Sequence, residues 1–549
     1  MSKITRFFDD GTPSTATDVK HYLTVPDEFY DLESTPTTGV PEESFLKSEE
    51  YAFSENTPPN NPYHGRFATV DLTPLTAKTP AGYYTMIDPE PYYKHEIEKP
   101  KKPTGCYIPH RVIICTFLMF SNIICYVDRV NMAVAIIPMA KEFNWSERTQ
   151  GSILSSFYWG YLFTQILGGI LSKQFGGKVV LYTGVCLWSC LTLLTPIFAD
   201  LATKYWLGIL IFARVGLGIG EGVNFPAVTQ MFSVWVPKSE RSRSWSIIGA
   251  GTDIGTLIAL LLGPVITVYI GWQWTFYIFG FVGLIWAGLF LFLASSLPSE
   301  SSFCKPYEKF YIEQSIKEEN DSTESDTTDA NVGAFRFMWN VLRSGAMWAA
   351  VLAPVCFSYG SYLLGTYMPK YMLSLGVSFA HSGYYSSLPY FFISICAPIW
   401  GFISDSTILR YDVNVQNMRK IMTVISMVGA PFFWFFLRFT RFSIVLSTCL
   451  LCVSSSLSAA HRAGSSMSTV DIGGPKYASI LYSVSNTFQT IPGIVGPLVT
   501  GWILDEIPLI ESTIISFSPW DVVFNIMIII NFVGAIIFVA LGKGVPQYK

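Results

Sequence analysis

Six charged side chains lie inside long apolar stretches of this sequence, where a charge is costly. They are Asp128, Arg129, Arg214, Glu221, Asp253 and Arg462. A charge in hydrocarbon costs at least about 2.5–3.5 kcal/mol on insertion scales, so each of these residues must be paired or face a water-filled cavity. They are therefore the first candidates for chemistry.

The spacing of Arg214 and Glu221 excludes direct pairing between them. Two helical turns separate them, which places both on nearly the same helix face but about 10.5 Å apart along the axis. Each side chain therefore needs another partner. A central cavity that holds a bound ion meets this need for both.

The chemistry of these groups indicates anion binding coupled to a cation. Arginine stays charged, and its planar fork donates two parallel hydrogen bonds to a carboxylate or phosphate. We expect the anion to bind at Arg214, with help from Arg129 or Arg462. A buried carboxylate can exchange a proton or bind Na⁺, so Glu221 or Asp253 is the expected ion-coupling residue. The alternative is an internal salt-bridge lock between helices, and for Asp128 we favour a partner on a neighbouring helix.

The composition indicates a membrane protein. The chain has 549 residues, of which 50% are hydrophobic and only 14% are charged, and its formal net charge is −4. Soluble domains carry about 25% charged residues. This argues against a soluble enzyme, a nucleic-acid binder or a disordered scaffold. We find no catalytic cluster and no metal-ligand cluster, so neither an enzyme nor a metal site is expected.

Apolar stretches of about twenty residues alternate with short polar breaks from Tyr107 onward, the length that crosses a bilayer. The expected spans are 111–137, 150–172, 179–199, 205–233, 242–268, 273–295, 346–372, 382–404, 419–438, 442–468, 477–504 and 521–542. A span in lipid must satisfy its own backbone groups. The sequence therefore predicts an all-α membrane protein with twelve transmembrane helices in two six-helix bundles.

Four regions follow from this pattern. Residues 1–107 are polar and rich in Pro, Thr and Ser, and we expect a disordered cytosolic N-terminal tail without a cleavable signal peptide. Residues 108–297 form the N-terminal bundle and 341–549 the C-terminal bundle. Residues 298–340 are too polar to insert and are expected to be a cytosolic linker.

The two halves resemble each other weakly, as in transporters built from a duplicated six-helix unit. Gly263-Pro264 in the fifth span and Gly496-Pro497 in the eleventh are one such match. Lys and Arg are more frequent in the segments on the same side as the two termini, which predicts that both termini are cytosolic. The kind of membrane, plasma membrane or endomembrane, stays open.

Several motifs resemble one known family. They are Tyr126-Val-Asp-Arg-Val-Asn-Met-Ala-Val-Ala135, Phe157-Tyr-Trp-Gly-Tyr161, Arg214-Val-Gly-Leu-Gly-Ile-Gly-Glu-Gly-Val-Asn-Phe-Pro-Ala227, Glu240-Arg-Ser-Arg243 and Asp471-Ile472. In these runs the chain resembles the anion-transporter branch of the major facilitator superfamily, which includes sodium–phosphate cotransporters, sialin, vesicular glutamate transporters and plant plastid phosphate transporters. The resemblance covers roughly residues 108–545.

This resemblance implies twelve helices and alternating access, with anion transport driven by a cation gradient. Arg214 and Glu221 match the charged pair of the family's fourth helix, and Arg129 matches its first-helix arginine. By analogy with the superfamily, Asp405 is expected to act in gating. The expected partners are a small anionic substrate and the lipid bilayer, with no nucleic acid and no obligate protein partner. No cofactor is expected beyond Na⁺ or H⁺ as the coupling ion.

Departures from the family pattern bear on the substrate. Leu154 and Phe357 replace a histidine and an arginine of the vesicular glutamate members, and Arg462 and Asp253 are unusual for the family. We therefore expect transport of inorganic phosphate or a small organic anion. The alternatives are a carboxylate carrier (sialic acid-, ascorbate- or pantothenate-like) and a non-transporting nutrient sensor with the same fold.

Overall fold

The structure is a computed structural model that describes residues 76–78, 84–86, 107–324, 343–440, 443–507, 510–511 and 516–543. The chain divides into two compact units, Met1–Glu96 and Ile97–Lys549. In the first unit, strands β1 (Thr76–Lys78) and β2 (Tyr84–Met86) pair antiparallel, with Thr76 opposite Met86. The prediction of a disordered tail lies outside the described residues, apart from this hairpin and Tyr107.

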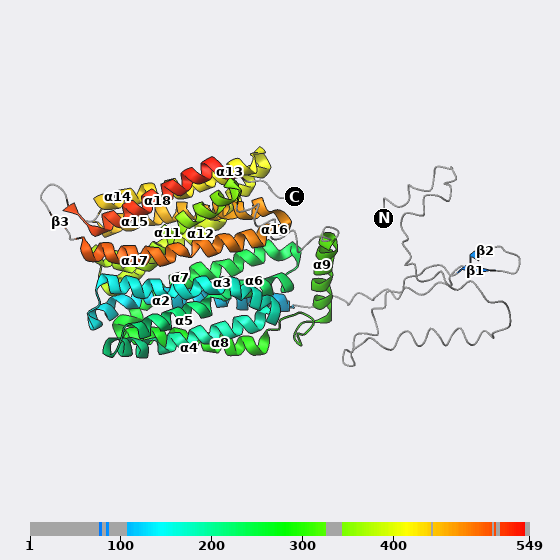
Figure 1. Ribbon diagram of the computed structural model, residues 1–549, viewed down its shortest axis with the longest axis horizontal. Helices are drawn as coiled ribbons and strands as arrows, with labels where there is room; N and C mark the ends of the chain where they lie inside the picture. Colours follow the sequence, from blue (N-terminus) through cyan, green and yellow to red (C-terminus); the bar gives the residue numbers. More distant parts are fainter. Residues whose placement is uncertain are drawn as a thin grey trace. The chain divides into compact units, whose positions relative to one another are not determined.

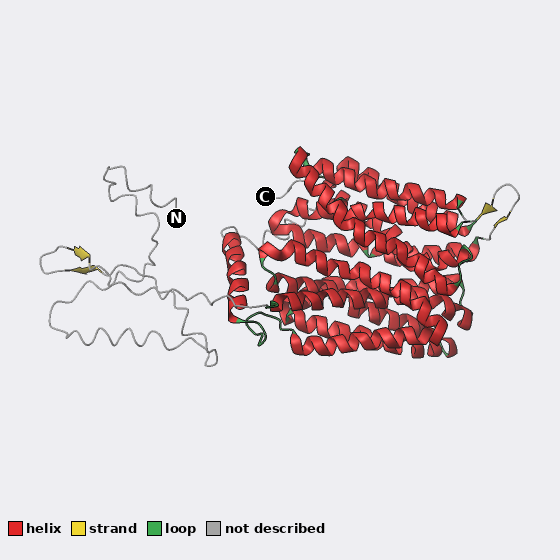
Figure 2. Cartoon of the chain, turned by 180° about the vertical axis from the view of Figure 1, so that it is seen from behind, coloured by secondary structure: helices red, strands yellow, loops and turns green. Residues whose placement is uncertain are grey.

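The second unit is nearly all helical (Figures 1 and 2). Its first group of helices consists of α2 (His110–Phe143), α3 (Glu147–Phe175), α4 (Gly177–Lys204), α5 (Gly208–Gly222), α6 (Asn224–Trp235), α7 (Arg241–Ile270) and α8 (Trp272–Leu293), with the short 3₁₀ turn η4 (Lys238–Glu240) before α7. Helices α5 and α6 together form one long span. These helices cover the six expected N-terminal spans except for residues 205–207, 223 and 294–295.

The second group follows Arg343. It consists of α11 (Gly345–Ser374), α12 (Phe379–Tyr411), α13 (Val415–Val424), η5 (Ile425–Gly429), α14 (Ala430–Phe436), η6 (Leu437–Phe439), α15 (Ile444–Ser458), η7 (Ala459–Ala463), α16 (Ser465–Gln489), α17 (Ile491–Glu506) and α18 (Pro519–Leu541). Strands β3 (Ile510–Glu511) and β4 (Ser516–Phe517) pair antiparallel between α17 and α18. The expected linker contains a further helix, α9 (Pro306–Glu324), which crosses one end of the helical unit in Figure 1.

Ten of the described helices are long and apolar enough to cross a membrane. The expected span 150–172 lies within α3, and the expected span 477–504 lies within α16 and α17. One boundary differs from the prediction, because α16 is helical through the polar break between 468 and 477. The chain turns earlier, at Gly464, where a Cβ would lie 2.7 Å from Thr423 Oγ1, so only glycine fits.

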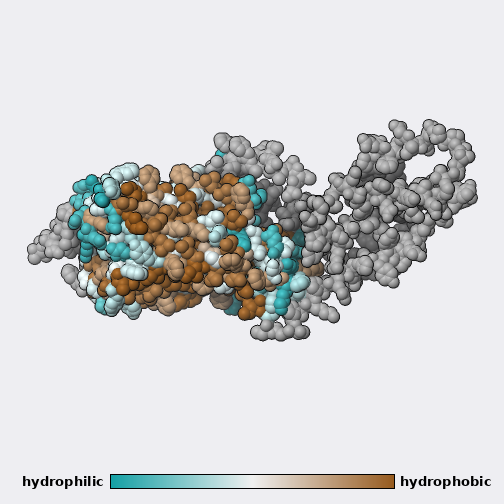
Figure 3. Space-filling model, turned by 90° about the horizontal axis from the view of Figure 1, so that it is seen from below, coloured by the Kyte–Doolittle hydropathy of each residue, from teal (hydrophilic) through white to brown (hydrophobic). Residues whose placement is uncertain are grey.

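The surface of the helical unit fits a bilayer. Figure 3 shows apolar side chains over the middle of the unit and hydrophilic ones at its two ends. Large side chains such as Phe163, Phe292 and Ile536 are well exposed on the sides of the helices. A water-soluble protein rarely exposes so many large apolar side chains on one continuous surface. The chain is therefore a multi-pass membrane protein whose helices present an apolar belt to lipid.

The two groups of helices meet at backbone contact where α3 begins and α17 ends. A Cβ on Gly151 of α3 would lie 2.5 Å from the Pro497 carbonyl oxygen of α17. Ion pairs join the same end: Lys370 bonds Glu147, and Arg148 Nε lies 3.5 Å from Asp505. We name this the Glu147 end. The opposite end, where α2 and α7 begin and α18 finishes, is the α9 end (Figure 1).

Candidate functional site

Arg129 and Glu221 form a sealed ion pair inside the N-terminal bundle. Arg129 Nη2 and Nε lie 3.1 and 3.2 Å from Glu221 Oε2, and the two side chains are 7% and 0% exposed. The Cys125 thiol, one helical turn before Arg129, donates to the same oxygen at 3.3 Å. Glu221 thus finds its partner on α2 and not on its own helix, as the spacing to Arg214 requires.

Three aromatic rings surround the Arg129 guanidinium. Its central carbon lies 4.7, 5.0 and 4.5 Å from the ring centres of Tyr126, Phe157 and Tyr161. Rings stabilise a cation that has lost its water, because their faces carry partial negative charge. The pair and its rings form a rigid unit that holds Glu221 in place.

Glycines on α5 bring these rings to the pair. A Cβ on Gly218 would lie 2.0 Å from the Phe157 carbonyl oxygen, and one on Gly222 would lie 2.0 Å from Thr164 Oγ1. No larger residue fits at either position, so α3 and α5 approach at backbone contact. This close packing presses Phe157 against both arginines, since its ring centre also lies 5.4 Å from Arg214.

Arg214 is buried without a full set of partners. Its residue is only 2% exposed, and its Nε and Nη1 atoms make no hydrogen bond within the described part of the chain. Its electrostatic neighbours include Glu221 and Asp128. Two N–H groups of a buried guanidinium left unpaired are costly, and an oxyanion is the group that best satisfies them. Arg214 is therefore the strongest candidate for the anion site.

Asp128 lies next to this site. Both of its carboxylate oxygens are buried and make no direct hydrogen bond of standard geometry within the described residues, and its expected role as a partner for a neighbouring helix stays a prediction. It interacts electrostatically with Arg214 and Glu221. Asn131, one turn further along α2, has its amide buried and unpaired in the same way. Asp128 and Asn131 are three residues apart and therefore share one face of α2, a feature that the sequence alone already shows.

Arg462 and Asp253 pair with each other between the two bundles. Arg462 Nη2 donates to Asp253 Oδ1 at 2.8 Å and to Oδ2 at 2.9 Å. The Arg462 side chain is 49% exposed and that of Asp253 is 11% exposed. Arg462 belongs to η7 and Asp253 to α7, so the contact joins the C-terminal group to the N-terminal group. For this pair the geometry matches the inter-helix lock that we kept as an alternative.

Asp405 is exposed on α12. Its neighbour Ser404 belongs to a hydrogen-bond network around Arg419. Arg419 forms that network: its Nε lies 2.7 Å from Asp471 Oδ2, and its Nη1 donates to Ser404 and to the Ala463 carbonyl. Sequence reasoning singled out Asp405 and missed Arg419. The gating role of Asp405 stays a prediction.

Helix α9 is fixed by Glu308. This carboxylate accepts hydrogen bonds from the Tyr107 hydroxyl, from the His110 and Arg111 backbone N–H groups at 2.8 and 2.9 Å, and from Arg111 Nη1 at 3.1 Å. Burial alone would raise the pKa of Glu308, but these bonds and the Arg111 charge hold it below its usual value. Burial and the bond to Glu308 raise the pKa of Tyr107 to about 12. Glu308 thus caps the first turn of α2 and ties the linker to the bundle.

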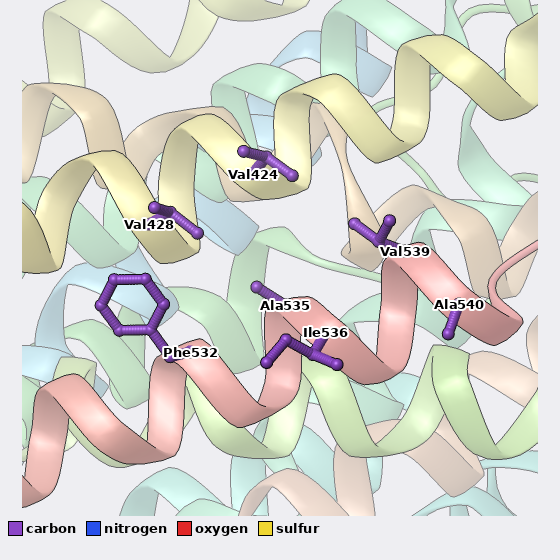
Figure 4. A pocket seen from close by; sticks show the side chains of 7 residues that line it. All are labelled: Val424, Val428, Phe532, Ala535, Ile536, Val539 and Ala540. Atoms are coloured by element: carbon purple, nitrogen blue, oxygen red, sulfur yellow. The ribbon is translucent and has the colours of Figure 1, made fainter.

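A groove between the α13–η5 segment and α18 has no polar chemistry (Figure 4). It has a volume of about 310 Å³, and its lining consists of Val424, Val428, Phe532, Ala535, Ile536, Val539 and Ala540. Ile536 and Val539 are exposed on the outer surface of the unit. The groove therefore opens on the apolar belt and is unsuited to an anion.

A multi-pass helical unit with charges buried between its helices has the architecture of a membrane transporter, and solved structures share this fold. A bacterial homologue of the human lysosomal transporter Spinster, in an inward-facing and occupied conformation, aligns with a TM-score of 0.60 at 15% identity, over 79% of this chain and 97% of that one. Residues 118–497 match the Major Facilitator Superfamily. The chain belongs to this superfamily, which confirms the predicted fold class.

Its relatives place it in the anion-transporter branch. It is 37% identical to probable anion transporter 4, chloroplastic, of Oryza sativa subsp. japonica, over 79% of this chain and 69% of that protein. The ascorbate transporter, chloroplastic, of Arabidopsis thaliana is 35% identical, over 79% and 75%. The sodium-dependent phosphate transport protein 1, chloroplastic, of the same plant is 34% identical, over 79% and 80%. The family resemblance drawn from the motifs is confirmed.

Proposed function

We propose that this protein is a secondary active transporter that moves inorganic phosphate or a small organic anion across its membrane by cation-coupled alternating access. The observation that carries the proposal is Arg214, a buried guanidinium with two unpaired donors in the described structure. Membrane charges without a structural partner are functional by default, because burial is so costly. An anion that accepts hydrogen bonds from Nε and Nη1 would supply the two partners that this arginine lacks.

The neighbouring groups set the charge of the site. Arg129 and Arg214 carry two positive charges, and Glu221 and Asp128 carry two negative charges when both are ionised. Such a site is neutral overall and attracts an anion poorly. Protonation of one carboxylate, or binding of Na⁺ to one, leaves a net positive charge that favours the anion. The charge balance of the site therefore makes anion binding depend on cation binding.

Within this charge balance, Asp128 is better placed than Glu221 to accept the cation. Glu221 already has a charged partner in Arg129 at 3.1 Å, so taking its charge away would also unpair Arg129. Asp128 has no such hydrogen-bonded partner in the described chain. We therefore assign Arg129 and Glu221 to positioning, and Asp128 joins Glu221 and Asp253 as an ion-coupling candidate.

Alternating access requires the two bundles to part at the Glu147 end. There the backbones of α3 and α17 touch at Gly151, and ion pairs of Glu147 and Arg148 cross the contact. Packed interfaces of this kind switch between discrete arrangements and do not stretch continuously. Rocking of one bundle against the other would break these pairs and expose Arg214 to that side.

Phosphate leads as substrate because the chain departs from the glutamate members and resembles a phosphate transport protein. A carboxylate is the second candidate, since a relative of equal similarity is named for ascorbate transport. Arginine serves either group, because its fork matches both oxyanions. Arg214 therefore selects for a negative charge, and the surrounding residues select between phosphate and a carboxylate.

Transport by purified protein in liposomes tests the proposal. Labelled phosphate and labelled carboxylates are offered in turn, under an imposed H⁺ or Na⁺ gradient or with none. We expect one anion to accumulate only when a cation gradient is present. Arg214→Gln should abolish this uptake while the protein remains folded. Wild-type protein that binds anions but moves none would contradict transport and favour a sensor.

A further inference from the structure

We propose that Arg462 is a second anion-binding residue, contributed by the C-terminal bundle, and that Asp253 occupies it in place of the anion when the transporter is empty. This inference rests on the proposed function and names a further residue that acts on the same substrate. Asp253 would be a built-in competitor, since its carboxylate offers Arg462 the same group that a carboxylate or phosphate substrate offers.

The first argument is the way Arg462 is used. Both carboxylate oxygens of Asp253 bond a single nitrogen, Nη2, at 2.8 and 2.9 Å. Arginine–carboxylate pairs are frequently bidentate, with two guanidinium nitrogens donating. Arg129 uses two nitrogens in this way toward Glu221. Nε and Nη1 of Arg462 make no hydrogen bond with the residues that the structure describes. The bonding capacity of Arg462 is therefore only partly used.

The second argument is exposure. The Arg462 side chain is 49% exposed although its residue lies within a membrane-spanning helix, Ile444–Ser468. Asp253 lies twelve residues into α7, about 18 Å from its first residue along the axis, so the pair is well inside the membrane. A charged side chain at this depth survives where it borders a water-filled space. We therefore infer that the exposed part of the Arg462 side chain borders such a space.

The third argument is location. Tyr482 of α16 interacts electrostatically both with Arg462 and with Tyr161, whose ring covers Arg129. The partner of Arg462, Asp253, lies two residues before Gly255, where a Cβ would lie 3.0 Å from Tyr126 Cβ, and the Tyr126 ring covers Arg129. An anion held by Arg462 would therefore lie at the junction of the two bundles, which is where transporters of this architecture hold their substrates.

Exchange at Arg462 has a consequence for coupling. An anion that displaces Asp253 keeps Arg462 paired but leaves the Asp253 carboxylate, only 11% exposed, without its counter-charge. An unpaired charge in such a place is strongly unfavourable. Asp253 therefore takes up a cation when the anion arrives, and both are released together when the pair re-forms.

A purely mechanical lock between the bundles is the competing explanation, and it makes different predictions. A lock needs one positive and one negative group but is indifferent to which bundle carries which. Substrate competition requires the guanidinium to stay on η7, because the anion uses it. Exchanging the two residues therefore separates the explanations.

The test compares variants of the full chain in liposomes, with labelled phosphate as probe and the labelled carboxylates as a parallel series. Asp253→Asn removes the competitor, so we expect KM to fall several-fold and uptake to lose its dependence on the cation gradient. Arg462→Gln should raise KM about tenfold, in line with the loss of a charge-assisted hydrogen bond. The double exchange Asp253→Arg with Arg462→Asp should stay as defective as Arg462→Gln. Arg410→Gln, which removes an exposed arginine of the same bundle, is the matched control and should leave KM unchanged.

Two results would overturn the inference. Wild-type uptake restored by the double exchange would show that only the ion pair matters, and an unchanged KM in Asp253→Asn would show that Asp253 does not compete. Arg462→Lys, which keeps the charge, covers the case in which Arg462→Gln does not fold, and it should raise KM with maximal rate retained. If the wild-type protein transports none of the probes, the proposed function fails instead.

Discussion

Two intramembrane ion pairs of similar composition have opposite surroundings. Arg129–Glu221 lies within one bundle and is closed to solvent, with side chains 7% and 0% exposed. Arg462–Asp253 joins two bundles and is open on one side, with side chains 49% and 11% exposed. One pair has aromatic rings and a thiol around it, and the other has unused donors.

The difference in exposure distinguishes an ion pair that holds two helices together from an ion pair that can exchange its partners. A sealed pair cannot be broken without leaving a buried charge, so it fixes the geometry of helices α2 and α5. An open pair gains less from its attraction because solvent competes for both groups. Arg214 stands between these cases, since it is sealed like the first pair and unpaired like the free donors of the second.

Breaking the sealed pair should have the largest effect. Glu221→Ala leaves Arg129 buried without its counter-charge, and we expect a loss of about 3–5 kcal/mol of stability together with all transport. Thermal unfolding in detergent measures the first and uptake the second. In a double-mutant cycle, Arg129→Gln combined with Glu221→Ala should recover part of the lost stability. Additive effects of the two changes would mean that the pair is not a unit.

Removal of Arg214 should separate function from stability. Its guanidinium lacks two hydrogen bonds and is compensated only at a distance by Asp128 and Glu221, so the melting temperature of Arg214→Gln should stay equal or rise. Uptake should nevertheless be lost. A large drop in melting temperature would mean that Arg214 is a structural member of the bundle after all.

Asp128→Asn should change coupling more than binding. Neutral asparagine imitates the protonated acid, so the anion should still bind and exchange across the membrane. Accumulation driven by a cation gradient should disappear. Counterflow and gradient-driven uptake, measured side by side, check this. Gradient-driven accumulation at the wild-type level would show that Asp128 takes no part in coupling and would leave that role to Asp253 or Glu221.

The smallest effect is expected at the α9 end. Glu308→Gln weakens the cap on α2 and should cost about 1–3 kcal/mol locally, with uptake retained. Because the folded pKa of Glu308 lies below its usual value, its contribution is present at neutral pH and is lost as the pH falls through that lowered pKa. Hydrogen exchange of α9 should therefore differ between wild type and variant at pH 7 and converge once the pH has fallen below that lowered pKa. Equal exchange at pH 7 would argue against the cap.

The fold was largely predictable because bilayer thickness dictates the length of each apolar run. Elements outside the bilayer were not, since helix α9 has too polar a sequence to show an apolar periodicity, and the break before Tyr477 is helical although it contains Gly473-Gly474-Pro475. In such segments tertiary contacts, such as those of Glu308, decide the structure and local propensity does not.

The charged residues were predictable as a set but not as pairs. Burial cost identifies which charges need partners, whereas Arg129 and Glu221 are 92 positions apart and Arg462 and Asp253 are 209 apart. Sequence spacing excluded only the pairing of Arg214 with Glu221. For Asp128 the sequence favoured a partner on a neighbouring helix but could not name it, and only the packing of α2 against α5 places it beside Arg214.

The central claim, that Arg214 binds the transported anion, is tested most directly by anion-dependent stability. A ligand that binds only the folded state raises the melting temperature with its concentration. We predict that the transported anion, phosphate or a carboxylate, stabilises wild-type protein progressively and leaves folded Arg214→Gln unaffected. An equal rise in both proteins would place the anion elsewhere and contradict the account.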